Sequence, residues 1–198
     1  MAFPTNTTVL ENFNAVDAHP MTGWTDLYEG VDSNGTTGQG SAASAISYRN
    51  TLHSDPVEFY LTVTTKPGNG SFLGLHVFTA DTVGYTVQIV CASGTDSVAL
   101  YRIDGPGDST QLGSTISQEF SNGDGLGLEV TDGTNGIKAY RRSSGTWSQL
   151  GTTQNDTNHT GSKRPCIEFG DTTARVDDLC GGTVVAASST PIYHIMNQ

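Results

Sequence analysis

The stretch TADTVGYTVQIV (79–90), followed closely by GTDSVALYRID (94–104), decides the fold. Apolar and polar residues alternate through both segments, and residues typical of turns separate them. Alternation of period two is typical of β-strands with one buried face, because successive side chains of a strand point to opposite faces. One face of the first segment, continued to the next residue, Cys91, is therefore predicted to lie in the core: Tyr85, Val87, Ile89 and Cys91.

The same alternation continues on both sides of this stretch. In VEFYLTVTT (57–65), four apolar residues share one face: Val57, Phe59, Leu61 and Val63. Further strands are predicted at residues 72–78, 97–103, 126–130, 136–142, 145–151, 165–171 and 173–179. Turns rich in Gly, Asn and Asp separate them, so 57–151 is predicted to be an antiparallel meander. No segment keeps a helical period long enough to predict a helix, and QLGSTISQEF (111–120) is the weakest assignment.

The length of 198 residues fits one domain with a core of its own. Many short strands at regular spacing indicate a sandwich or a barrel. The segment 31–45 (VDSNGTTGQGSAASA) has few apolar residues and is predicted to be a long surface loop. We divide the chain into an N-terminal arm (1–8), a domain (9–182) and a C-terminal tail (183–198). The tail is expected to dock onto a partner through its apolar residues Ile192, Tyr193, Ile195 and Met196.

The charge balance excludes some partners. Twenty acidic residues against nine basic ones give a formal net charge of −11, which would repel a nucleic-acid backbone. Neutral glycans and bound cations are compatible with this balance. The start MAFPTNTTVLENF lacks the basic and apolar regions of a signal peptide, and no apolar run is long enough to span a membrane.

Three cysteines, Cys91, Cys166 and Cys180, make an odd number without the spacing of a metal site. We predict reduced, buried thiols. A disulfide between Cys166 and Cys180 is the open alternative.

Four segments carry a resemblance to a known family: LENFNAVDAHPMTGW (10–24), GLHVFTADTVGYTVQIV (74–90), SNGDGLGLEVT (121–131) and GDTTARVDDLCGG (170–182). Together they resemble the concanavalin A-like, laminin-G-like jelly-roll domains of tailed-bacteriophage virion proteins and of some secreted bacterial proteins. The resemblance spans about residues 9–182. It implies an all-β fold, a two-sheet antiparallel jelly-roll sandwich in which the first and last strands are neighbours.

That neighbourhood implies that Glu11 lies near Asp177 and Asp178. Many relatives carry calcium at such carboxylates, so these three residues form a candidate Ca²⁺ site, and no other cofactor is expected. The alternative is that these carboxylates cap strand ends and are exposed to solvent.

Catalytic motifs are not found in the sequence. Glycosidases of this fold carry Glu-x-Asp-x-x-Glu or Glu-x-Asp-x-Glu on a strand, and the nearest pairs, Glu129 with Asp132 and Glu168 with Asp171, lack the second Glu. The five histidines are scattered, and we interpret His76 as a solvent-facing or packing residue. We therefore expect no enzymatic activity.

Glycan binding requires less, namely an aromatic ring beside hydrogen-bonding side chains. The candidate platforms are Trp24, Tyr28, Tyr140 and Trp147, with Tyr48 as a further one. In the alternative interpretation Trp24 belongs to the core and Trp147 covers a sheet edge.

The favoured hypothesis is a non-catalytic surface protein of a phage virion, either a capsid decoration protein or a minor tail protein. Such a protein would be made in the host cytoplasm and sit on the virion surface, bound to other virion proteins and to copies of itself, for example as a trimer. It could also bind a host cell-surface glycan. The alternative is a carbohydrate-binding module of a bacterial surface or secreted system, and a glycan hydrolase or lyase is the least favoured hypothesis.

Overall fold

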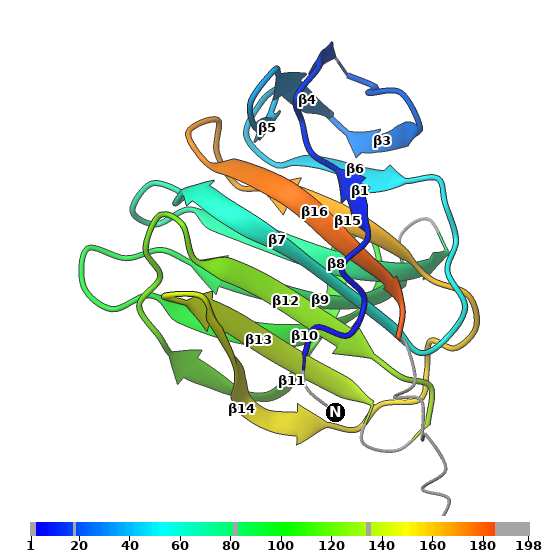
Figure 1. Cartoon of the computed structure of the whole chain (residues 1–198). Helices are drawn as coiled ribbons and strands as arrows, with labels where there is room; N and C mark the ends of the chain where they lie inside the picture. The colour runs from blue at the N-terminus through cyan, green and yellow to red at the C-terminus, as the bar shows by residue number, and fades with distance from the viewer. Residues whose placement is uncertain (1–2, 18, 81–82, 134–135, 185–198) are drawn as a thin grey trace, which may run out of the picture.

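The computed structural model describes residues 3–17, 19–80, 83–133 and 136–184, and within them it contains strands and turns but no helix. The strands form two sheets packed face to face (Figure 1). Their bounds are β1 Val9–Glu11, β2 Val16–Asp17, β3 Trp24–Tyr28, β4 Val31–Asn34, β5 Gly38–Gly40, β6 Ala45–Arg49, β7 Val57–Thr65, β8 Phe72–Ala80, β9 Val83–Val90, β10 Ser97–Gly105, β11 Asp108–Ser117, β12 Gly125–Val130, β13 Ile137–Ser143, β14 Thr146–Gln154, β15 Arg164–Phe169 and β16 Arg175–Thr183.

The two sheets differ in size. The nine-stranded sheet has the order β14-β13-β12-β7-β16-β5-β4-β2, with β1 also paired to β16. The seven-stranded sheet has the order β11-β10-β9-β8-β15-β6-β3. The strand pairs of both sheets are antiparallel. The predicted two-sheet antiparallel sandwich is therefore confirmed.

The predicted meander is divided between the sheets. Strands β8 to β11 follow one another in the seven-stranded sheet, whereas β7 and β12 to β14 belong to the nine-stranded sheet. Most of the weakly assigned segment 111–120 lies in β11, an edge strand whose side chains are mostly exposed. An edge strand exposed on both faces carries little alternation, which explains the weak signal.

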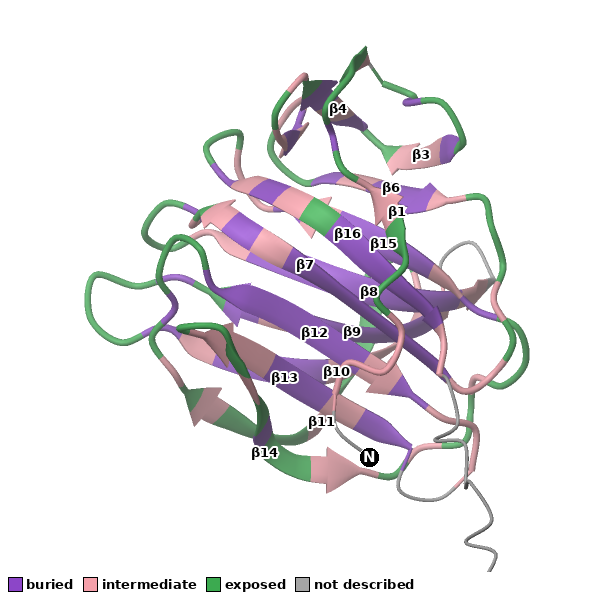
Figure 2. Ribbon diagram, viewed as in Figure 1, coloured by how far each residue is buried: buried purple, intermediate pink, exposed green. Residues whose placement is uncertain are grey.

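The core lies between the sheets and is formed by the faces that alternation predicts. Figure 2 shows that the buried residues are concentrated in the central strands of the sheets. Val57, Phe59, Leu61 and Val63 of β7 are fully buried, and so are their counterparts on β8 and β9. All three cysteines are free and buried. Cys166 lies on β15 and Cys180 on β16, in different sheets, so the predicted thiols are confirmed and the alternative disulfide is not formed.

The prediction of a long surface loop at 31–45 is wrong. These residues form β4, β5 and the start of β6. At Gly38 the backbone itself packs on the core, because an added Cβ would lie 2.6 Å from Cε1 of Phe13. Glycines supply the buried face here, so the segment lacks the apolar alternation on which the prediction depended.

The first and last strands are neighbours, as the resemblance implied. Val9 of β1 lies opposite Cys180, and Glu11 lies opposite Leu179, with an irregularity between the two pairs. The N-terminal residues before β1 continue along the outer face of the nine-stranded sheet (Figure 1).

Asp171 holds the turn between β15 and β16. Its carboxylate accepts hydrogen bonds from the backbone N–H groups of Gly68 (2.7 Å), Thr173 (2.9 Å) and Ala174 (2.9 Å). Burial alone would raise the pKa of Asp171, but the hydrogen bonds from Ala174, Gly68 and Thr173 outweigh it and lower the pKa to about 2.

We expect Asp171→Asn to lower the free energy of unfolding at pH 7 by about 1–2 kcal/mol. The carboxylate has a lowered pKa in the folded state, so its contribution is complete above about pH 4 and is lost as the pH falls toward 2. Urea unfolding at pH 7 and at pH 3 should therefore show a smaller difference between variant and parent at the lower pH. The exposed Asp178→Asn is the control, and an Asp171→Asn effect that does not change with pH would contradict this account.

Candidate functional site

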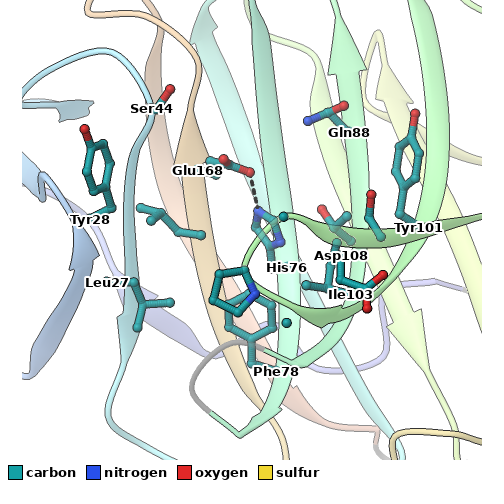
Figure 3. Close-up of a pocket in the computed structure, with 16 residues that line it drawn as sticks. Leu27, Tyr28, Ser44, His76, Phe78, Gln88, Tyr101, Ile103, Asp108 and Glu168 are labelled. Atoms are coloured by element: carbon teal, nitrogen blue, oxygen red, sulfur yellow. Dashed lines mark hydrogen bonds and ion pairs between the residues drawn. The ribbon is translucent and has the colours of Figure 1, made fainter.

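A pocket of about 650 Å³ opens on the outer face of the seven-stranded sheet (Figure 3). Its floor comes from β8, β9 and β15, and its sides come from β3, β6, β10, the turn at 106–107 and the start of β11. On β8 the core-facing residues Leu73, Leu75 and Val77 are fully buried, so the alternate residues His76 and Phe78 face the pocket. The period of the strand thus builds the core and the pocket floor from one segment.

A hydrogen-bonded pair lies at the centre of the floor. His76 is only 3% exposed, and its Nε2 lies 3.1 Å from Oε2 of Glu168 on the neighbouring strand β15 (Figure 3). Gly74 leaves room for this arrangement, because a Cβ there would lie 2.8 Å from the same Nε2. The carboxylate of Glu168 accepts the bond, which assigns the proton of a neutral imidazole to Nε2.

The second ring nitrogen of His76 is then an acceptor. Nδ1 is buried and has no hydrogen-bond partner in the part of the chain that the structure describes. A buried polar atom without a partner costs free energy, and a ligand hydroxyl could donate a hydrogen bond to this nitrogen.

Aromatic and amide side chains surround the pair. Tyr28 is 59% exposed on one side of the pocket, and Tyr101 stands on the other side (Figure 3). Gln88 points in from β9, and Asp108 lies at the start of β11, at the border of the pocket. The lining contains no Lys or Arg among the described residues, so His76, Glu168 and Asp108 are its titratable groups apart from the tyrosines. Apolar rings with a few polar groups between them suit a neutral polar ligand with an apolar face.

The predicted glycan platforms do not come together. Of the four residues, Tyr28 lines the pocket, whereas Trp24 is 4% exposed and packs against Phe13 with ring centroids 6.3 Å apart. Trp24 therefore belongs to the core, as the alternative interpretation stated. Tyr48 is also buried, beneath the guanidinium of Arg164.

Tyr140 and Trp147 lie on the nine-stranded sheet, whereas the pocket lies on the seven-stranded sheet. They pack with Tyr60 and with Phe3 of the N-terminal arm on the outer face of the nine-stranded sheet. The arrangement forms an aromatic surface, but the chain's own Phe3 covers it.

The predicted calcium ligands do not fit a metal ion. Glu11 forms an ion pair with Arg49 at 2.8 Å and accepts a hydrogen bond from Nε1 of Trp24 at 3.3 Å. Burial and the neighbouring Asp178 raise the pKa of Asp177. Within the described residues, no group of three His, Cys, Asp or Glu side chains could hold a metal ion. The pairing of β1 with β16 is present, and the carboxylate of Glu11 is paired with the guanidinium of Arg49.

Sequence reasoning missed the two central residues of the pocket, His76 and Glu168. Both are polar residues at outward positions of otherwise apolar strands. This was the signal in the sequence that could have marked them as site residues. Alternation could not show that β8 and β15 are neighbours, because the two residues are 92 positions apart.

Arg141 pairs with Asp124 at 2.7 Å, whereas Arg142 extends over the ring of Trp147, so the two neighbouring arginines face apart. The docking residues Ile192, Tyr193, Ile195 and Met196 lie outside the described residues. None of the described segments is a helix of the length and apolarity that a membrane span requires.

No family model and no curated protein sequence matches this chain. Solved structures do. The carbohydrate binding module CBM66 from Bacillus subtilis is 18% identical with a TM-score of 0.61, and the match covers 83% of this chain and 98% of the module. A legume lectin-like domain from Entamoeba histolytica is 12% identical with a TM-score of 0.59, over 86% of this chain and 97% of that domain.

The exoplasmic/lumenal domain of VIP36, solved in a Ca²⁺/Man3GlcNAc-bound form, is 8% identical with a TM-score of 0.59, over 89% of this chain and 90% of that domain. At these identities the likeness concerns the fold alone. The chain has the two-sheet, antiparallel jelly-roll sandwich of the concanavalin A-like type.

Proposed function

We propose that this protein is a non-catalytic carbohydrate-binding module, with its site in the pocket on the seven-stranded sheet. One observation carries the proposal: buried His76, paired with the half-buried Glu168, lies on the pocket floor between two tyrosines, and within the described residues its Nδ1 has no hydrogen-bond partner and can accept a bond. The carbohydrate-binding module was the alternative in the sequence analysis. It now replaces the virion surface protein as the leading hypothesis, because the similar solved structures support it better.

The pocket would bind a sugar through two kinds of contact. The apolar face of a pyranose or furanose ring would stack on Tyr28 or Tyr101. Its hydroxyl groups would donate to Nδ1 of His76 and bond the side chains of Glu168 and Gln88. The carboxylates of the lining favour neutral sugars over uronic acids.

The non-catalytic part of the proposal rests on the chemistry of the carboxylates. Glycosidases need two carboxyl groups roughly 5–9.5 Å apart across the scissile bond. In the pocket, the carboxylate of Glu168 is hydrogen-bonded to His76, and the other lining carboxylate, Asp108, stands at the start of the edge strand β11. The similarity to a carbohydrate binding module and to a glycan-bound lectin-like domain supports binding as the role of this fold here.

We expect Tyr28→Ala to weaken binding of a neutral oligosaccharide about tenfold, because it removes a stacking platform. His76→Ala should weaken binding further, since it removes both the acceptor and the partner of Glu168. Titration calorimetry with xylo-, manno- and fructo-oligosaccharides would measure the effect.

Leu52→Ala is the matched control, because Leu52 is an exposed apolar residue (54%) that does not line the pocket. Binding that survives both Tyr28→Ala and His76→Ala would rule out the pocket as the site. Turnover of any of these sugars would overturn the non-catalytic assignment.

The biological setting stays a separate proposal. The resemblance of residues 9–182 to phage virion proteins suggests that the module is displayed on a virion as a capsid decoration or minor tail protein. Removal of residues 184–198 should then abolish incorporation into particles and leave the fold intact. Unchanged occupancy of the particles would contradict this role for the tail.

A further inference from the structure

The N-terminal arm crosses the outer face of the nine-stranded sheet, on the opposite side of the sandwich from the pocket (Figure 1). Its residues Phe3, Thr5 and Asn6 rest on one set of side chains, which we term the arm seat. The arm seat consists of Glu58, Tyr60, Gly127, Tyr140 and Trp147.

The first contact is a ring on a ring. Phe3 stacks on Tyr140 with centroids 3.8 Å apart and planes only 5° from parallel. Trp147 and Tyr60 present their rings at 78° and 70° to Phe3, at 5.0 and 6.0 Å. The arm seat therefore forms a three-sided aromatic holder for one flat ring.

A glycine makes room for this ring. Gly127 lies between Tyr60 and Tyr140 in the register of β7, β12 and β13. A Cβ at Gly127 would lie 2.5 Å from Cζ of Phe3. The gap in the row of side chains is thus filled by a ring from outside the sheet.

The second contact is a buried carboxylate. Glu58 is 1% exposed, and its Oε1 accepts hydrogen bonds from the N–H of Thr5 (2.5 Å), the hydroxyl of Thr5 (2.8 Å) and the N–H of Asn6. These are the hydrogen bonds to Glu58 that the structure describes, and all of them come from the arm. Glu129, directly across the strand pair, is held by Lys138 and Tyr140 within the sheet. Of the two carboxylates, Glu58 is therefore the one whose hydrogen bonds come from a segment lying over the outer face of the sheet.

We propose that the arm seat is a second carbohydrate site, for glycans containing N-acetylhexosamine, and that the N-terminal arm is its displaceable cover. The arm presents a flat apolar ring, a hydroxyl donor and amide N–H donors. An N-acetylhexosamine presents the same three groups: an apolar ring face for Tyr140, hydroxyls, and an acetamido N–H for Glu58. Uronic acids are disfavoured, because the carboxylate of Glu58 would repel a second carboxylate.

The arm and the glycan would compete for the same contacts. The apparent association constant is then the intrinsic one multiplied by the fraction of molecules whose arm is displaced. Weakening the arm should tighten glycan binding, which is the opposite of what a purely structural arm would do.

The test uses the full chain and two probes, chitohexaose and cellohexaose, which differ in the acetamido group. We expect the Phe3→Ala variant to bind chitohexaose at least about ten times more tightly than the parent chain does. Binding should change the tryptophan fluorescence, because Trp147 belongs to the arm seat. Thr7→Ala is the matched control, because Thr7 belongs to the arm but is exposed, and it should bind as the parent does. Cellohexaose should bind the Phe3→Ala variant more weakly than chitohexaose.

A second pair of variants separates this proposal from the pocket. Adding His76→Ala to Phe3→Ala should leave the gain intact, whereas adding Glu58→Gln should remove it. Equal affinity of the parent and Phe3→Ala for chitohexaose, or a gain lost with His76→Ala, would overturn the proposal. If Phe3→Ala does not fold, Thr5→Val removes one hydrogen bond to Glu58 and should give a smaller gain in the same direction, and no gain there would also overturn it.

Discussion

Replacing Lys163 with Met is expected to lower the free energy of unfolding by about 3–5 kcal/mol. The Lys163 side chain is fully buried, and its Nζ bonds Oδ1 of Asp55 (2.8 Å), the carbonyl oxygen of Gly161 (2.8 Å) and Oδ1 of Asp132. Without the ammonium, the partly buried carboxylates of Asp55 and Asp132 lose their counter-charge. Urea unfolding followed by circular dichroism would measure the loss.

Two further variants separate charge from packing. Lys163→Met combined with Asp55→Asn and Asp132→Asn should recover part of the lost stability, because the uncompensated carboxylates are then removed. Lys138→Met is the control for an ion pair at the sheet surface, and its effect should stay below about 1 kcal/mol. If Lys163→Met behaved like Lys138→Met, the buried cluster would not hold the fold.

The cluster around Lys163 also bears on the proposed site. It joins the segment before β7, the segment after β12 and the start of β15. Since β15 carries Glu168, loss of Lys163 should weaken sugar binding in the pocket as well as stability. Binding lost together with stability, and regained with it in the triple variant, would show this coupling.

The sheets could be predicted because their buried faces alternate. Val57, Phe59, Leu61 and Val63 are at zero exposure as alternation requires, and the strand bounds of β7 coincide with the predicted segment. Where glycine supplies the buried face, as at Gly38 in β5, the sequence contains no such pattern and the strand was missed. The prediction of strands thus succeeded where side chains fill the core and failed where backbone does.

The site was harder to predict, because it depends on which strands are neighbours. Tyr28 was predicted as a platform and lines the pocket, but Trp24, four residues earlier on the same strand, is in the core. Residue type alone cannot separate these two aromatic residues. His76 and Glu168 form a pair only through the register of β8 with β15, which no local pattern contains.

The aromatic surface at Tyr140 and Trp147 was predicted in part. These residues do form a platform, but the residue that covers it, Phe3, belongs to an arm that we placed outside the domain. The arm contributes one aromatic ring and a few hydrogen-bond donors, so its sequence shows no alternation of apolar and polar residues. Short segments of this kind are the part of a site that sequence patterns show least.

Gly181→Ala is expected to destabilise the fold by about 3 kcal/mol or more, because strain and overlap add. Gly181 has a φ of +129°, a conformation that a residue with a Cβ rarely adopts. A Cβ there would lie 2.0 Å from the carbonyl oxygen of Glu58 and 2.8 Å from Cα of Phe59, both backbone atoms of β7. Neither atom can rotate away, so β16 would have to separate from β7. Thermal and urea unfolding would measure the loss.

Gly70→Ala is the matched control for this change. Gly70 also has a positive φ, +81°, but nothing lies within 4 Å of an added Cβ, so its replacement should cost only about 1–2 kcal/mol of conformational strain. The difference between the two variants isolates the overlap with β7. Equal effects would mean that β16 can shift away from β7 at no cost, which would contradict the predicted overlap with the backbone of β7. Because Gly181 also donates its N–H to the carbonyl of Thr8 at 2.9 Å, a displaced β16 should release the arm and expose Trp147 before the sandwich unfolds.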